Sequence, residues 1–133
     1  YTQAHAICQQ LGNLALGAEA SAGLALIALA GGRPQQAFTQ IEPLLLLLQH
    51  NGTVGLHEPF FVILATYRVL SAVGDQRAAG VLTTGYAQLQ RDADGIADAA
   101  LRQSFWAAVP VHRELQQIYA AMQQTATAAA AAA

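Results

Sequence analysis

The feature that most constrains this chain is the dipeptide Gly74-Asp75, which separates two long stretches of helical periodicity. In the stretch before it, 58–73, Pro59 suits the first turn of a helix, and apolar residues then recur at helical spacing. Glycine commonly ends a helix and aspartate commonly caps the next one, so the pair predicts a very short turn. A turn of that length makes the helix expected over 76–92 fold back antiparallel on its predecessor.

A single hairpin leaves an apolar side uncovered, so the fold needs further helices, and the same signals predict them along the chain. They are expected over 2–11, 14–30, 35–49, 99–108 and from Pro110 to about 124. The sequence therefore predicts an all-α fold of about seven helices. Its parts are a half-hairpin at 1–12, hairpins at 14–50 and 58–92, and a C-terminal hairpin at 98–124. The Ala-rich tail at 125–133 is assigned no function.

The low charge of the chain bears on what could surround these helices. Hydrophobic residues make up 54% of the sequence and charged residues 11%, about half the usual charged share of a soluble domain. This balance suggests that more protein covers much of the surface. The net charge is −2, and the six basic residues, all arginine, form no stripe, which argues against nucleic-acid binding. The most apolar windows, 14–30 and 59–73, are shorter than the ~20 residues of a membrane span and predict buried helices.

Two helices carry features with specific expectations. In the helix over 35–49, Pro43 predicts a kink, because proline lacks the N–H that a regular helix uses. The five leucines at 44–48 cover every face, so this helix is expected to be buried nearly all round or to meet another chain. Near the C-terminus, Asp98 is expected to cap a helix that buries Leu101 and Phe105.

The chain also contains an internal repeat. The segment 32–37, Gly-Arg-Pro-Gln-Gln-Ala, matches 74–79, Gly-Asp-Gln-Arg-Ala-Ala, at an offset of 42 residues. A glycine at the turn between two helices, followed by a small alanine, resembles the tetratricopeptide repeat, whose usual period is about 34 residues. The extra length is absorbed by a loop at 49–57 and by longer helices. The resemblance implies a single domain over 1–124, built as a tetratricopeptide-like α-solenoid of antiparallel hairpins.

The C-terminal third resembles a narrower group, on the residues Leu89, Ile96, Asp98, Leu101, Arg102, Ser104, Phe105, Val109, Pro110, His112, Arg113 and Leu115. This pattern is similar to the helical tails of large bacterial signal-transduction ATPases and of cyclase-linked or transcriptional regulators. In that group ATP binding and any cyclase or DNA-binding activity belong to upstream domains. The chain has no lysine and therefore no G-x-x-x-x-G-K-[ST] motif. The resemblance thus implies a non-catalytic tail that binds a partner and needs no cofactor.

The repeat resemblance also implies where a partner would bind, because the first helix of each pair lines the concave groove. The corresponding residues are Glu19, Ala22, Leu26, Leu29, Phe61, Leu64, Arg68 and Ser71. Arg68 lies between apolar residues, which suits an anchor for a peptide carboxylate or an acidic helix. The alternative is that these residues only pack against a neighbouring helix.

Candidate metal sites fail on spacing. His5 and Cys8 would share a helix face, but no further ligands accompany them, and a buried thiol is the favoured interpretation. The pair His57-Glu58 lacks the second histidine of H-E-x-x-H and is interpreted as part of a loop and helix start. The segment 92–95, Asp-Ala-Asp-Gly, lacks the glutamate that a calcium loop places at its twelfth position, so a solvated helix end is favoured.

Candidate catalytic groups fail in the same way. His112 and Arg113 are expected at the margin of the last helix, because Val111 and Leu115 point inward, and a structural pairing through Arg102 is favoured over acid–base chemistry. Ser104 has no base and acid to complete a triad. The sequence therefore predicts neither a metal site nor an enzyme.

Two functions remain open. The first is a protein-interaction module of a larger bacterial regulator, which would be cytoplasmic. The second is a structural subunit whose open solenoid ends stack head to tail into a filament or tube, which would be cell-surface or extracellular. In either case the partner is a protein: a different protein for the interaction module, or further copies of this chain for the structural subunit.

Overall fold

The computed structural model describes residues 14–132, and this part of the chain is helical without any strand. Six helices follow one another: α2 (Leu14–Ala30), α3 (Pro34–Asn51), α4 (Pro59–Ala72), α5 (Ala78–Asp94), α6 (Ala99–Ala107) and α7 (Pro110–Ala132). The all-α prediction is confirmed. The expected helix at 2–11 lies outside the described residues, so the count of seven helices stays a prediction.

The chain divides into two compact units, Tyr1–Ala79 and Gly80–Ala133, called unit 1 and unit 2 below. Unit 1 contains α2, α3 and α4, and unit 2 contains nearly all of α5 together with α6 and α7. The predicted hairpin of α4 with α5 would join the two units, and it stays a prediction, as does the single domain over 1–124.

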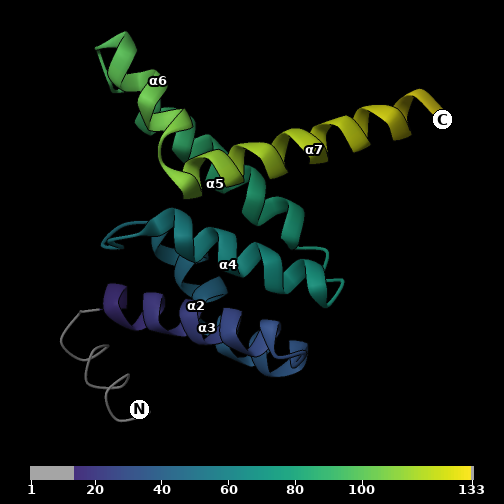
Figure 1. Ribbon diagram of the computed structural model, residues 1–133. Coiled ribbons are helices and arrows are strands. Elements are labelled where there is room, and N and C mark those ends of the chain that lie inside the picture. The colour runs from purple at the N-terminus through teal and green to yellow at the C-terminus, as the bar shows by residue number, and fades with distance from the viewer. Residues whose placement is uncertain (1–13, 133) are drawn as a thin grey trace. The chain divides into compact units, whose positions relative to one another are not determined.

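Unit 1 is built around α4, which packs against both α2 and α3, while α2 and α3 pack against each other (Figure 1). Eight residues of α4 are buried: Phe60, Val62, Ile63, Leu64, Ala65, Thr66, Val69 and Leu70. The buried face of α2 consists of small side chains: Ala18, Ser21, Ala22, Ala25 and Ala28. Small residues let neighbouring helix backbones approach closely. Helix α2 therefore packs against its neighbours through its alanines, and its larger aliphatic side chains lie on its other sides.

The two repeated turns share the same local structure. Gly32 and Gly74 both have positive φ, 74° and 72°, a conformation that favours glycine. After α2, Arg33 N donates to Ala28 O at 2.9 Å and Gly32 N to Leu29 O at 3.1 Å. After α4, the N–H groups of residues 75 and 74 make the same pair of bonds, at 2.9 and 3.2 Å, to the carbonyls of residues 70 and 71. Both helices therefore end in a Schellman motif, as the glycines predict.

The repeat diverges immediately after the glycine. Helix α3 begins at Pro34, two residues after Gly32, whereas α5 begins at Ala78, four residues after its glycine. In the longer connection, Asp75 Oδ1 accepts a hydrogen bond from Arg77 N at 2.9 Å and forms a turn of its own. Consequently Ala37 is completely buried, whereas the matching alanine at position 79 is exposed and its neighbour Ala78 is buried.

Helix α3 runs through Pro43 as one element and ends at Gly52, whose N–H donates to Leu48 O at 3.0 Å. Its leucine run is not buried all round in this structure. Leu44 and Leu45 are buried, but Leu46 is 58% exposed. Because α2 and α4 are the described helices that pack on α3, they cover only part of its circumference.

Unit 2 is held by caps and aromatic contacts. Asp98 Oδ1 accepts a hydrogen bond from Leu101 N at 3.0 Å, which confirms the predicted cap of α6. Helix α6 nevertheless buries none of its residues, and the expectation that it buries Leu101 is wrong, since that side chain is 63% exposed. In α7, Leu115 is buried, and the second half of the helix extends beyond α5 and α6 (Figure 1).

Candidate partner-binding surface

The residues predicted to line a groove lie on α2 and α4, two helices of unit 1 that pack directly against each other. Their exposure differs widely. Ala22 and Leu64 are buried, Glu19, Leu26, Leu29, Phe61 and Arg68 are half-buried, and Ser71 is exposed. A partner could therefore reach six of the eight. The assignment of the groove as a whole stays a prediction.

Glu19 has a structural role at this surface. One of its carboxylate oxygens, Oε1, accepts a hydrogen bond from the backbone N–H of Glu58 at 2.7 Å. Glu58 is the residue before α4, and its own side chain makes no capping bond to that helix. A carboxylate at a helix N-terminus satisfies an N–H group that has no partner within the helix and interacts favourably with the helix dipole. Glu19 thus fixes the start of α4 against α2.

Phe61 and Arg68 are the two large half-buried residues that α4 brings to the predicted surface. They lie seven positions apart, so two helical turns place them on one side of α4. Leu64 lies between them in sequence but is buried, which makes it a packing residue of unit 1. The accessible residues of the predicted site on α4 are thus Phe61 and Arg68, both half-buried, and the exposed Ser71.

Helix α2 carries an exposed apolar face that the sequence analysis did not single out. Leu24 is 37% exposed and Ile27 is 64% exposed, three residues further along the same side. Ala20 and Ala30 are exposed as well. Because α2 is apolar around its whole circumference, hydrophobic periodicity could not tell which side would meet α3 and α4. No sequence signal marks this face.

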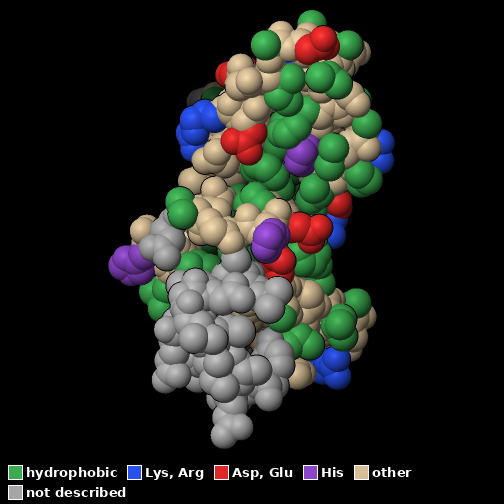
Figure 2. All heavy atoms as spheres, turned by 90° about the vertical axis from the view of Figure 1, so that its left-hand side faces the viewer, with side chains coloured by type: hydrophobic (Ala, Val, Ile, Leu, Met, Phe, Trp, Pro, Cys, Tyr) green, Lys and Arg blue, Asp and Glu red, His purple; other side chains and the backbone are tan. Residues whose placement is uncertain are grey.

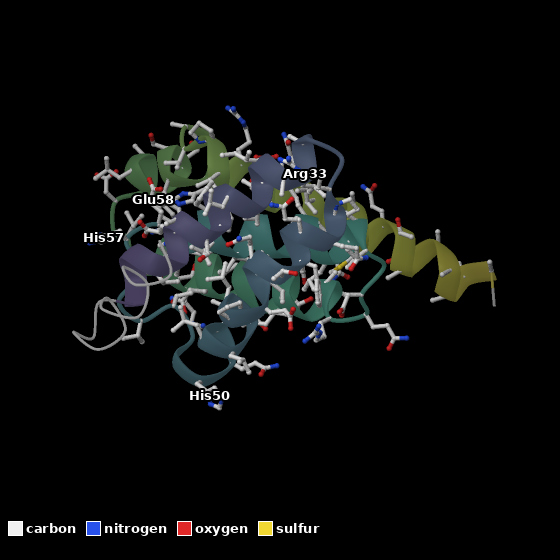
Figure 3. All side chains as sticks on the ribbon, turned by 90° about the horizontal axis from the view of Figure 1, so that it is seen from below. Arg33, His50, His57 and Glu58 are labelled. Carbon is white, nitrogen blue, oxygen red and sulfur yellow. The ribbon has the colours of Figure 1, made fainter. Side chains whose placement is uncertain are left out.

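The polar candidates do not converge. Figure 3 shows His57 and Glu58 beside the N-terminal part of α2, His50 at the end of α3, and Arg33 at the opposite end of the same helices. Within 14–132, no three His, Cys, Asp or Glu side chains gather as metal ligands would. The pair His5 and Cys8 lies outside the described residues. Charged side chains are scattered over the described part of the face in Figure 2.

Among residues 14–132, Asp75 and Arg77 form the ion pair whose two groups have clearly shifted pKa values. Arg77 Nη2 donates to Asp75 Oδ2 at 2.7 Å, and Nε donates to Oδ1 at 3.0 Å. These bonds, together with that from the backbone N–H of Arg77, lower the pKa of Asp75 to about 2. The pKa of Arg77 is raised by the same carboxylate. The guanidinium also lies 6.0 Å from the centre of the Phe38 ring, so the pair links the turn to α3.

The segment 92–95 is a helix end, as expected, since Asp92 and Asp94 belong to α5 and Gly95 follows it. Asp92 Oδ1 accepts a hydrogen bond from Gln88 Nε2 at 2.8 Å, one turn earlier in the same helix. This arrangement is helical rather than loop-like, and it satisfies a carboxylate that a calcium loop would keep for the ion.

The expectations for His112 and Arg102 require correction. His112 is buried rather than marginal, with 9% of its surface exposed, and its ring lies 4.2 Å from that of Phe105. Val111, expected to point inward, is half-buried. Arg102 donates from Nε and Nη2 to Ile96 O, at 3.0 and 2.9 Å, and thus closes the connection before α6. The reason is that backbone carbonyls are the partners of these side chains: Ile96 O, in the connection before α6, accepts from Arg102, and Phe105 O, in the last turn of α6, lies 2.9 Å from His112 Nδ1.

Comparison with family models, with curated proteins and with solved structures finds no match to this chain. None of the helices described between residues 14 and 132 combines the length and the apolar character that crossing a bilayer requires. The structure thus shows an all-helical protein over residues 14–132.

Proposed function

We propose that this chain is a non-catalytic, tetratricopeptide-like module that binds a protein partner through α2 and α4. The observation that carries the proposal is the recurrence of one turn, a positive-φ glycine with the same two hydrogen bonds, at Gly32 and Gly74. Recurrence at an offset of 42 residues is typical of a repeat protein. The packing of α4 on both helices of the preceding hairpin supports it, because stacked repeats bury their apolar sides on their neighbours.

The partner class follows from the residues that remain accessible. Phe61 supplies an aromatic contact and Arg68 a planar cation suited to a carboxylate. An extended acidic peptide or an acidic helix fits this pair better than a nucleic acid does. The origin of the chain in a larger bacterial regulator is part of the same proposal and rests on the sequence resemblance.

The test is selection of short peptides from a random display library on the full chain, followed by titration of a selected peptide. Phe61→Glu should abolish binding, and Arg68→Ala should weaken it, with the helical circular dichroism signal retained. Leu46→Glu on α3 is the matched control, because Leu46 is exposed outside the predicted groove. Binding that survives Phe61→Glu but is lost in the Leu46 variant would place the site elsewhere. Failure to select any peptide would count against the module.

A second function, self-assembly into a filament or tube, is favoured by the exposed apolar residues Ile27 on α2 and Leu101 on α6. Each lies on a helix with a single charged residue, and in both cases that residue makes a hydrogen bond within the chain. Sedimentation velocity over a wide concentration range distinguishes the two functions. Growing assemblies that Ile27→Glu abolishes would support the filament, whereas a monomer at all concentrations would eliminate it.

A further inference from the structure

Unit 2 contains a pair of tyrosines in an unusual relationship. Tyr86 on α5 and Tyr119 on α7 have nearly parallel rings, 8° apart, with centroids separated by 4.0 Å. Both side chains are half-buried, so each ring keeps one part in contact with solvent. Tyr119 Oη accepts a hydrogen bond from Gln123 Nε2 at 3.0 Å, which holds that ring in place. The stack joins two helices that are separated by α6 in the chain.

We propose that Tyr86 and Tyr119 form a site of oxidative cross-linking, at which a one-electron oxidant converts the stacked pair into 3,3′-dityrosine. The reaction requires two phenol rings that meet while both are radicals, and the stack keeps them in van der Waals contact. The bond joins one Cε atom of each ring, the carbon ortho to the phenolic hydroxyl group. These carbons reach each other by rotation about χ2, which is a soft torsion in tyrosine.

The step balances with a peroxidase and hydrogen peroxide as the oxidant. Each tyrosine loses one electron and its phenolic proton, and the two radicals couple through a carbon–carbon bond. The two ring hydrogens at the new bond then move to the oxygens and restore the phenols. The product has lost two electrons and two protons in total, and hydrogen peroxide takes them up to form two molecules of water.

The arrangement around the stack supports a specific cross-link. Within unit 2, the ring of Tyr86 has Tyr119 of α7 as its stacked neighbour, and its centroid lies 5.9 Å from that of Trp106, which does not form a dityrosine. Of the two remaining tyrosines, Tyr67 belongs to α4 in unit 1, and Tyr1 lies outside the described residues. The product would close a covalent loop from α5 to α7. Such a loop restricts the unfolded chain and stabilises unit 2, as a disulfide does.

The experiment treats the full chain with a peroxidase and limiting hydrogen peroxide, followed by cleavage after arginine and mass spectrometry. Cleavage separates the two tyrosines into peptides 78–91 and 114–133. The expected product is these two peptides joined, lighter than their sum by two hydrogen atoms. Met122 lies in the second peptide and forms a sulfoxide under the same conditions. The yield of joined peptide is therefore the sum of the species with methionine and with methionine sulfoxide. The yield per molecule should be unchanged on tenfold dilution, because the link is intramolecular.

Tyr119→Phe should remove the joined peptide entirely, and Tyr67→Phe should leave its yield unchanged. Phenylalanine keeps the stack and removes the hydroxyl, so the variant should fold; Tyr86→Phe provides the same test from the other side. Oxidation in concentrated urea should also lose the preference for this pair. A link that forms only between chains, or one that joins Tyr67 or Tyr1 as often, would overturn the proposal, as would no link at all.

Discussion

His112 Nδ1 lies 2.9 Å from the carbonyl oxygen of Phe105, so the first turn of α7 is hydrogen-bonded to the last turn of α6. A carbonyl only accepts, and the imidazole therefore carries its hydrogen on Nδ1. Arg113 Nη1 adds a longer bond, 3.3 Å, to Ala107 O. Two side chains of one helix thus satisfy carbonyls at the C-terminus of another, where a helix leaves its carbonyls without partners of its own.

This relationship predicts that His112→Ala destabilises the protein. The substitution leaves the Phe105 carbonyl without this donor and opens a space beside the Phe105 ring, at a cost of about 1–3 kcal/mol. Arg113→Ala is the matched control, because its longer bond is exposed and its loss should cost less than about 0.5 kcal/mol. Urea unfolding followed by circular dichroism measures both. Equal effects of the two substitutions would contradict a special role for the histidine.

The repeated turns predict opposite effects of the same substitution at different glycines. Gly32→Ala and Gly74→Ala should each destabilise by about 1 kcal/mol, because alanine in a left-handed conformation is strained. Gly23→Ala should stabilise by about 0.5–1 kcal/mol, since Gly23 is inside α2 and an added methyl group would meet nothing within 4 Å. Thermal unfolding of the three variants checks the signs. Stabilisation by either turn substitution would be incompatible with the Schellman motifs.

The leucine run of α3 predicts a sharp contrast between neighbours. Leu45 is 4% exposed, so Leu45→Ala should cost about 2–5 kcal/mol through lost burial and the cavity left behind. Leu46→Ala, at the adjacent exposed position, should change stability by less than about 0.5 kcal/mol. The free energy of unfolding of each variant decides the matter. Should the Leu46 substitution cost as much, that residue is buried, either by the rest of the chain or by another copy.

The ion pair at the turn after α4 predicts a pH dependence. The pKa of Asp75 is lowered from 3.8 to about 2, which means that the ionised carboxylate is more stable in the folded state than in the unfolded state. This contribution is fully present above pH 3.8 and is lost as the pH falls towards 2. Asp75→Asn should therefore lower the urea midpoint at pH 7, and the two proteins should converge near pH 2. A constant difference over that range would show that the carboxylate charge is not responsible.

Local residues determined where the helices begin and end. Pro59 and Pro110 stand at the first positions of α4 and α7, Asp98 caps α6, and Gly32 and Gly74 end α2 and α4. Each of these effects depends on hydrogen bonds and torsions within about six residues, so the sequence contains the whole cause. The helix bounds could be predicted to within a few residues for that reason.

Burial was decided by the tertiary structure. Leu101 is exposed and His112 is buried, the reverse of what their hydropathy suggests, and His112 is held against α6 by its hydrogen bond with the Phe105 carbonyl. Ala22 and Leu64, two residues of the predicted groove, are buried where α2 and α4 pack. The sequence by itself therefore determined an all-helical chain with its turns and caps. Which sides of nearly all-apolar helices face outward depends on neighbours distant in sequence, and only the packing of those helices decided it.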